Sequence, residues 1–95
     1  KIKEGMIFSN EPGYYEKNKF GIRIENLIYV KNKKNKMYFE NLTMAPIDKD
    51  LIDHEMLSKN EKLWLNTYHE KVFQNLRSSM NKLELKDLIK ACSAI

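Results

Sequence analysis

The chain has 95 residues, of which 42% are hydrophobic and 32% are charged, and its formal net charge is +4. This profile is typical of a globular unit with at most one modest core. No uninterrupted apolar run approaches the length of a membrane-spanning helix, and the N-terminal KIKEG lacks the apolar segment of a signal peptide. The single cysteine, Cys92, excludes an internal disulfide and fits a reducing compartment, so we expect a cytoplasmic location without membrane contact.

Much of the positive charge lies in one segment, KNKKNK, at residues 31–36. A Lys/Asn block without interleaved aromatic residues or arginines is typical of a solvated loop rather than of a phosphate-binding face. We therefore expect no nucleic-acid partner.

The first half of the chain predicts antiparallel β-strands. Residues 6–10 (MIFSN) form a short strand that should stop at Pro12 and Gly13, because this pair bends the backbone and cannot continue a ladder. Residues 21–30 (GIRIENLIYV) alternate, and one face of that strand is mainly apolar, with Ile22, Ile24, Asn26, Ile28 and Val30. Beyond the Lys/Asn loop, residues 37–47 predict a third strand. These three segments suit an antiparallel meander.

The second half of the chain changes to a helical pattern. Ser58 and Glu61 have the S-x-x-E spacing of a capping box, which satisfies unpaired amides of the first turn. Apolar residues then recur at steps of three or four, which predicts a helix with Leu65, Tyr68, Val72, Leu76 and Met80 on one stripe. A second, shorter helix carries the stripe Leu85, Leu88, Ile89 and Cys92. The sequence therefore predicts an α+β fold with apolar surface left over for a partner.

Two carboxylates occupy unusual positions in the strand region. Glu11 precedes Pro-Gly and two tyrosines in SNEPGYY, and Glu25 lies in the middle of a mostly apolar strand, where an unpaired charge would be costly to bury. One interpretation is that Arg23, on the same face, forms a half-exposed ion pair with Glu25. The other is that Glu11 and Glu25 converge on metal cations while Arg23 holds a carboxylate in place. Composition and spacing leave both open.

The sequence motifs of these segments also resemble those of a known enzyme family. GMIFSNEPGYY and GIRIENLIYV closely resemble the end of the catalytic domain of Xaa-Pro aminopeptidases (aminopeptidase P), in the pita-bread metallopeptidase family. LTMAPID and WLNTYH resemble the C-terminal extension of the larger, cytosolic-type members. The resemblance implies that residues 1–47 are the C-terminal part of a pita-bread catalytic domain and that residues 48–95 are a helical extension. It also implies that the chain is a fragment of a longer enzyme.

The resemblance further implies a role for four residues. Glu11 would ligate one of two divalent metals, and Glu25 would bridge both, while Tyr15 and Arg23 would brace these carboxylates. The expected metal is Mn²⁺, with Zn²⁺ or Co²⁺ as alternatives. Two such cations lower the pKa of a shared water, and the resulting hydroxide would attack the peptide bond that precedes proline. The implied activity is removal of the N-terminal residue from peptides with proline in the second position.

The remaining metal ligands of this family lie in segments that correspond to sequence upstream of Lys1. We therefore expect the chain to be inactive alone, to need the rest of the enzyme as its partner, and to take part in homodimer contacts through the extension. No general acid or base is expected in this chain. The alternative is a metal-free relative with the same fold that acts as a protein-interaction or dimerisation module.

The other chemically capable side chains favour structural roles. His54 lies in a polar connector, and His69 follows Tyr68 on the long predicted helix. Cys92 is expected to be a small buried hydrophobe rather than a nucleophile. Helical spacing explains the aromatic residues Trp64, Tyr68 and Phe73 as core or interface anchors.

Overall fold

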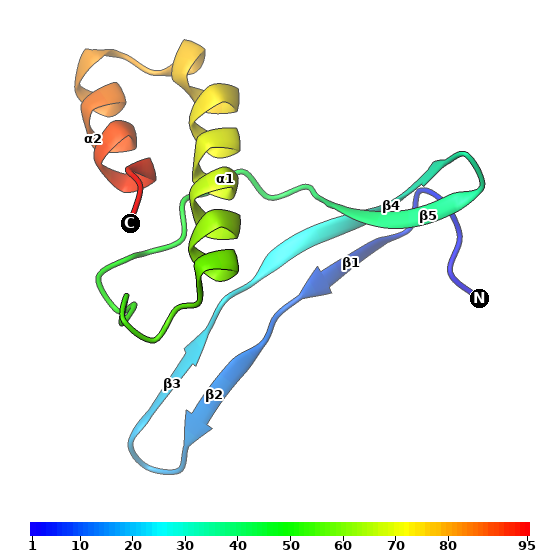
Figure 1. The fold of residues 1–95 in the computed structure, drawn as a ribbon, viewed down its shortest axis with the longest axis horizontal. Coiled ribbons are helices and arrows are strands. Elements are labelled where there is room, and N and C mark those ends of the chain that lie inside the picture. Colours follow the sequence, from blue (N-terminus) through cyan, green and yellow to red (C-terminus); the bar gives the residue numbers. More distant parts are fainter. The chain divides into compact units, whose positions relative to one another are not determined.

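The computed structural model describes all residues, 1–95, and the chain divides after Thr43 into two compact units. The first unit contains five strands, β1 (Ile7–Asn10), β2 (Gly13–Glu16), β3 (Phe20–Arg23), β4 (Asn26–Lys33) and β5 (Lys36–Asn41). The second contains α1 (Lys59–Leu76), the 3₁₀ turn η1 (Arg77–Ser79) and α2 (Lys82–Cys92) (Figure 1). The predicted order of antiparallel strands followed by two helices is confirmed, whereas the expected division after residue 47 stays a prediction.

The strands of the first unit form one long antiparallel ribbon with a third strand at one end. β1 pairs with β4, β2 pairs with β3, and β5 pairs with the other edge of β4. The ladder of β1 and β4 ends at the pair Asn10 and Asn26, and the ladder of β2 and β3 begins at Gly13 and Arg23. Both ladders have the same register, so β1 runs on into β2 and β3 runs on into β4 (Figure 1).

β1 ends at Asn10, which confirms the predicted stop of the first strand at Pro12 and Gly13, but the expectation that this pair cannot continue the ladder is wrong. The ribbon continues through this pair, because the carbonyl oxygen of Pro12 accepts a hydrogen bond of 3.1 Å from the N–H of Ile24, and Gly13 begins β2. Proline lacks only the donor of the ladder and keeps its acceptor, so it is tolerated where the regular pairing is interrupted. The predicted strand at residues 21–30 is interrupted opposite this point, between β3 and β4.

The chain reverses at the tip of the ribbon, between β2 and β3. Asn18 takes a left-handed conformation there, with φ of 59°, and the N–H of Lys19 donates to the carbonyl of Glu16 at 3.1 Å. Asparagine visits this conformation more readily than most residues.

The predicted Lys/Asn loop at residues 31–36 is also mostly strand. Only Lys34 and Asn35 lie outside β4 and β5, and both have positive φ (51° and 61°), as in a type I′ hairpin turn. Lys31 lies within β4, where its Nζ is 2.7 Å from Oε2 of Glu40 on β5. The alternation of apolar and polar residues that marks a strand is missing here, because every position from 31 to 36 is lysine or asparagine.

The third strand is shorter than the predicted 37–47, since β5 ends at Asn41. The N–H groups of Leu42 and Thr43 both reach the carbonyl of Leu27, at 2.8 and 3.4 Å. The hydroxyl of Thr43 accepts the N–H of Leu27 at 2.8 Å, which takes the donor that a further rung of the ladder would need.

The helical unit has the core of the chain. Tyr68 and Val72 of α1 pack with Leu88 of α2, and partly buried residues surround them: Met44, Ile47, Phe73, Leu76, Met80 and Cys92. The predicted capping box begins α1, because the side chains of Ser58 and Glu61 each accept the other residue's N–H. Neither helix has the length and apolar composition needed to cross a membrane.

Candidate metal centre

The continuous register of the ribbon places Glu11 opposite Glu25. Both residues lie in the short interval between the two ladders, one position from the hydrogen-bonded pair of Pro12 and Ile24. The neighbouring pair in an antiparallel ribbon is the non-hydrogen-bonded kind, in which side chains approach most closely and Cα atoms are typically about 4.5 Å apart. Two carboxylates that are 14 positions apart in sequence are thereby brought to facing positions on one side of the ribbon.

Arg23 lies beside this pair and neutralises part of its charge. Its Nε is 3.3 Å from Oε2 of Glu25, and the two side chains are 53% and 45% exposed. A hydrogen bond to the side chain of Tyr15 raises the pKa of Arg23, and the negative charges of Glu25 and then Glu11 add to this effect. The half-exposed ion pair that the sequence allowed is therefore present, and the guanidinium also lies close enough to Glu11 and Tyr15 to interact with both.

Tyr15 is the fourth residue of the group that includes Glu11, Glu25 and Arg23, and it lies on the same side of the ribbon. It pairs with Gly21, two residues before Arg23, and its ring lies across both Gly21 and Gly13. The sequence pattern placed Gly13 at the end of a strand and gave neither glycine a role at this site. Their positions opposite functional residues could have indicated a role, because Gly13 faces Arg23 and Gly21 faces Tyr15 across the hairpin.

The donor set of this group suits a hard cation. Two carboxylates and one guanidinium leave an excess of one negative charge, and carboxylate oxygens are ligands that divalent cations accept. Facing carboxylates repel each other, so a cation between them would remove an unfavourable interaction that one arginine only partly offsets. Nowhere in the chain do three or more His, Cys, Asp or Glu side chains gather in a group that could hold a metal ion. Glu11 and Glu25 therefore fit a metal site as a part of its ligands.

The two histidines and the cysteine lie in the helical unit. His69 is fully buried, and its Nε2 accepts the N–H of Ile47 at 3.0 Å. Burial and the nearby charge of Lys49 lower the pKa of His69. His54 is exposed. Cys92 is partly buried against the helical core, and this burial raises the pKa of its thiol.

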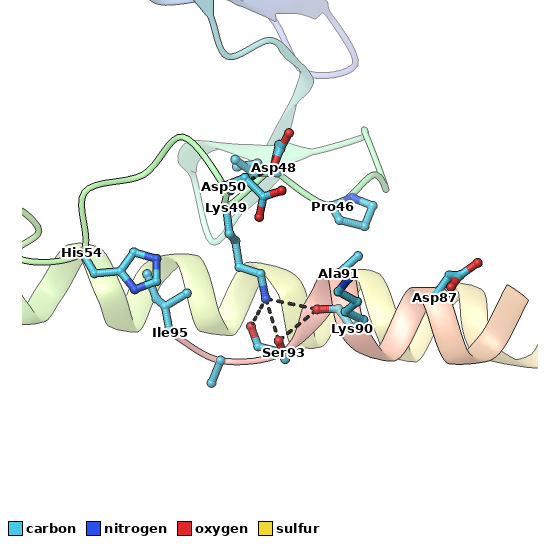
Figure 2. A pocket seen from close by; sticks show the side chains of 12 residues that line it. Pro46, Asp48, Lys49, Asp50, His54, Asp87, Lys90, Ala91, Ser93 and Ile95 are labelled. Carbon is cyan, nitrogen blue, oxygen red and sulfur yellow. Dashed lines mark hydrogen bonds between the residues drawn. The ribbon is translucent and has the colours of Figure 1, made fainter.

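A pocket of the helical unit lies beside the C-terminus of α2, and Lys49 projects into it (Figure 2). The Nζ of Lys49 donates to the carbonyl oxygen of Ser93 at 2.6 Å, to its hydroxyl at 2.7 Å and to the carbonyl of Lys90 at 3.2 Å. The cation thus caps the last carbonyl groups of the helix. Its hydrogen-bonding capacity is used by the fold rather than left for a ligand.

The sequence matches two family descriptions along its length. Residues 1–32 match "Metallopeptidase family M24", and residues 35–95 match "C-terminal region of peptidase_M24". Among curated relatives, the probable Xaa-Pro aminopeptidase P of Coprinopsis cinerea is 48% identical over 83 residues, which are 79% of this chain and 13% of that protein. The protein of the same name from Laccaria bicolor is 45% identical over 95 residues, covering 87% of this chain and 15% of that protein.

A solved structure is similar along almost the whole chain. The X-prolyl aminopeptidase of Caenorhabditis elegans, described as a cytosolic enzyme with a di-nuclear active site, has a TM-score of 0.83 and 34% sequence identity. The match covers 99% of this chain and 17% of that structure. The chain thus spans about one-seventh of the length of the relatives that it matches.

Proposed function

Because this chain belongs to metallopeptidase family M24, we propose that it is the C-terminal part of a dimetal aminopeptidase that removes the N-terminal residue from peptides with proline in the second position. The observation that carries this proposal is the facing position of Glu11 and Glu25 beside Arg23. The relatives named Xaa-Pro aminopeptidase P support the choice of substrate.

In this proposal Glu11 would be a ligand of one divalent cation and Glu25 would be a ligand shared by two. The metal pair, when bound, supplies a hydroxide nucleophile near neutral pH and polarises the carbonyl of the scissile bond. Carboxylate ligands favour Mn²⁺, and Zn²⁺ and Co²⁺ are the alternatives. The di-nuclear active site of the Caenorhabditis elegans enzyme supports the number of metals.

In this proposal a neighbouring side chain positions the carboxylate of Glu25 for ligation. Nε of Arg23 lies 3.3 Å from Oε2 of Glu25, and this ion pair favours one orientation of the carboxylate. The side chain of Tyr15 also interacts with the guanidinium of Arg23. Loss of such a supporting contact typically lowers metal affinity by about 10- to 100-fold, which corresponds to about 1 to 3 kcal/mol.

The other ligands, the substrate-binding groups and any proton-transfer groups come, in this proposal, from the remainder of the same enzyme. We also propose a cytosolic location and a homodimer. The description of the Caenorhabditis elegans enzyme as cytosolic supports the first. Exposed apolar residues on the helical unit support the second, namely Leu51, Met56, Leu63, Trp64, Leu83 and Ile89.

The test is hydrolysis of an Xaa-Pro peptide by the full-length enzyme with added Mn²⁺, together with metal analysis of the purified protein. Glu11→Gln and Glu25→Gln should each reduce the bound metal and lower kcat/KM by more than about 100-fold, because each removes an anionic ligand. The matched control is Glu16→Gln, which removes a carboxylate from the tip of the same ribbon. Glu16 binds Lys19 and Tyr14 instead, at 3.0 and 2.8 Å, so its removal should leave both readouts unchanged.

The same experiment distinguishes the alternative function. A full-length protein that binds no divalent metal and cleaves no Xaa-Pro peptide would be a metal-free relative in which the fold serves protein interaction. Activity that survives Glu25→Gln would contradict the assigned role of this carboxylate.

A further inference from the structure

We propose that Gly13 and Gly21 are positioning residues of the metal centre, because their missing side chains leave the space in which Tyr15 lies across the ribbon and reaches Arg23. The inference deepens the proposed function and rests on the assignment of Glu25 as a metal ligand.

The ring of Tyr15 occupies the positions that side chains of both glycines would need. A methyl group built on Gly13 would lie 2.7 Å from Oη of Tyr15 and 2.9 Å from both Cζ and Cε2. A methyl group built on Gly21 would lie 2.5 Å from Cδ1 and 3.0 Å from Cε1. All of these distances are well below van der Waals contact, where carbon atoms are about 3.5 to 4.0 Å apart. An alanine at either position therefore excludes the observed placement of the ring.

The backbone gives no other reason for glycine at these two positions. Positive φ is found at one glycine of the chain, Gly5, with 83°, so Gly13 and Gly21 have conformations that other residues adopt. Both lie in regular strands, where glycine is usually unfavourable because it packs nothing and loses more entropy on folding. The ring of Tyr15 is thus the feature that accounts for them.

The register explains why the two glycines together direct the ring toward Arg23. Gly21 faces Tyr15 across the ribbon, and the near side of the ring lies above it. Gly13 faces Arg23, and the hydroxyl end of the ring lies above Gly13. The ring therefore follows a path from its own strand position to that of the guanidinium. Arg23 in turn sits 3.3 Å from Glu25, so the space above the glycines is connected to the proposed metal ligand through the interactions of Tyr15 with Arg23 and of Arg23 with Glu25.

The test measures metal binding rather than turnover alone. Metal-free full-length enzyme is titrated with Co²⁺, and the visible absorption of bound Co²⁺ reports both affinity and ligand geometry. Gly21→Ala and Gly13→Ala should each raise the Kd for Co²⁺ by about tenfold or more, in the range expected for loss of a contact that orients a ligand. Tyr15→Ala should have a similar effect.

A double variant separates this role from a general effect on the fold. If the glycines act through the ring, Gly21→Ala should add nothing to Tyr15→Ala, because the ring that it displaces is already absent. Additive losses in the Gly21→Ala/Tyr15→Ala variant would overturn the inference. Gly13→Ala, which meets only the far end of the ring, gives a second and milder test should Gly21→Ala fold poorly.

Gly5→Ala is the matched control. Gly5 lies in the same unit, but it needs glycine for its backbone conformation and not for the space that a missing side chain leaves. No atom lies within 4 Å of a side chain built there, but φ of 83° is unfavourable for alanine. This variant should lower the melting temperature and leave the Kd for Co²⁺ unchanged. Unchanged Co²⁺ binding in Gly21→Ala and Gly13→Ala would overturn the inference, while unchanged binding in Glu25→Gln would overturn the proposed function beneath it.

Discussion

Nε of Arg23 lies 3.3 Å from Oε2 of Glu25, so a carboxylate of the candidate metal centre also takes part in an exposed ion pair. Exposed ion pairs contribute little to stability, usually about 0 to 1 kcal/mol. We expect Arg23→Lys to leave the melting temperature of the full-length enzyme nearly unchanged and to raise the Kd for metal by about 10- to 100-fold. The reason is that a lysine keeps the charge but loses the planar group that contacts Glu25 and Tyr15 together.

Lys19→Ala is the control for this prediction. It breaks another exposed ion pair of the same ribbon, in which Lys19 lies 3.0 Å from Glu16. Metal affinity should not change in this variant. Equal effects of the two substitutions would show that Arg23 acts through the stability of the ribbon and not through Glu25.

The buried His69 makes the stability of the helical unit depend on pH. Its Nε2 accepts the N–H of Ile47, which requires the neutral ring, and burial lowers its pKa from the ordinary value of 6.5. The unfolded chain therefore binds a proton more readily than the folded chain. The contribution of His69 to the free energy of unfolding is complete above about pH 6.5 and is lost progressively as the pH falls below it.

Urea unfolding of the chain at a series of pH values checks this expectation. His69→Gln should remove the part of the pH dependence that lies just below pH 6.5, because an amide oxygen can accept the N–H of Ile47 without titrating. The control is His54→Gln, at an exposed position, which should keep the wild-type profile. A profile that is the same in wild type and His69→Gln would contradict the prediction.

Leu88 is the buried residue of α2 in the core of the helical unit. It is 7% exposed and contacts the cluster of Tyr68 and Val72, whereas Leu83 on the same helix is 72% exposed. We expect Leu88→Ala to reduce the free energy of unfolding by about 2 to 5 kcal/mol through lost burial and a residual cavity. Leu83→Ala should stay within about 0.5 kcal/mol of wild type. Denaturant unfolding of the two variants would show comparable losses if α2 were not anchored through Leu88.

Lys49 caps the C-terminus of α2 across the pocket shown in Figure 2. Lys49→Met keeps the length of the side chain and removes the charge, so Ser93 and Lys90 lose their hydrogen-bond donor. The expected cost is about 1 kcal/mol, because the site is partly exposed and water replaces some of the lost contacts. Lys86→Met, at an exposed position within α2, serves as the control in thermal unfolding and should have little effect.

Local patterns were sufficient where neighbouring residues in the sequence decide the structure. The spacing of Ser58 and Glu61 predicted the capping box, which forms as expected. Apolar residues at helical steps predicted the core positions Tyr68, Val72 and Leu88, although Ile89 of the second stripe is 53% exposed. The same spacing in Asn81 and Glu84 would have predicted the cap of α2, where both side chains accept the partner's N–H.

Errors arose where the pairing of distant segments decided the structure. β1 ends before Pro12 as predicted, but Pro12 and Gly13 were also expected to end the ladder, and the ribbon instead resumes at Gly13 in the same register despite one missing donor. The lysines of residues 31–36 were expected to form a loop, but pairing of β4 with β5 leaves a turn of only Lys34 and Asn35.

The sequence by itself determined the residues with chemical potential, because Glu11, Arg23 and Glu25 could be singled out from their types and surroundings, and the resemblance to a known family added Tyr15. Tertiary pairing alone decided that they form one group, since the facing of Glu11 and Glu25 depends on a register set by rungs on both sides of them. Tertiary pairing also decided the role of Gly13 and Gly21. Their purpose is visible only when the ring of Tyr15, from the opposite strand in one case, is seen to fill the space that their missing side chains leave.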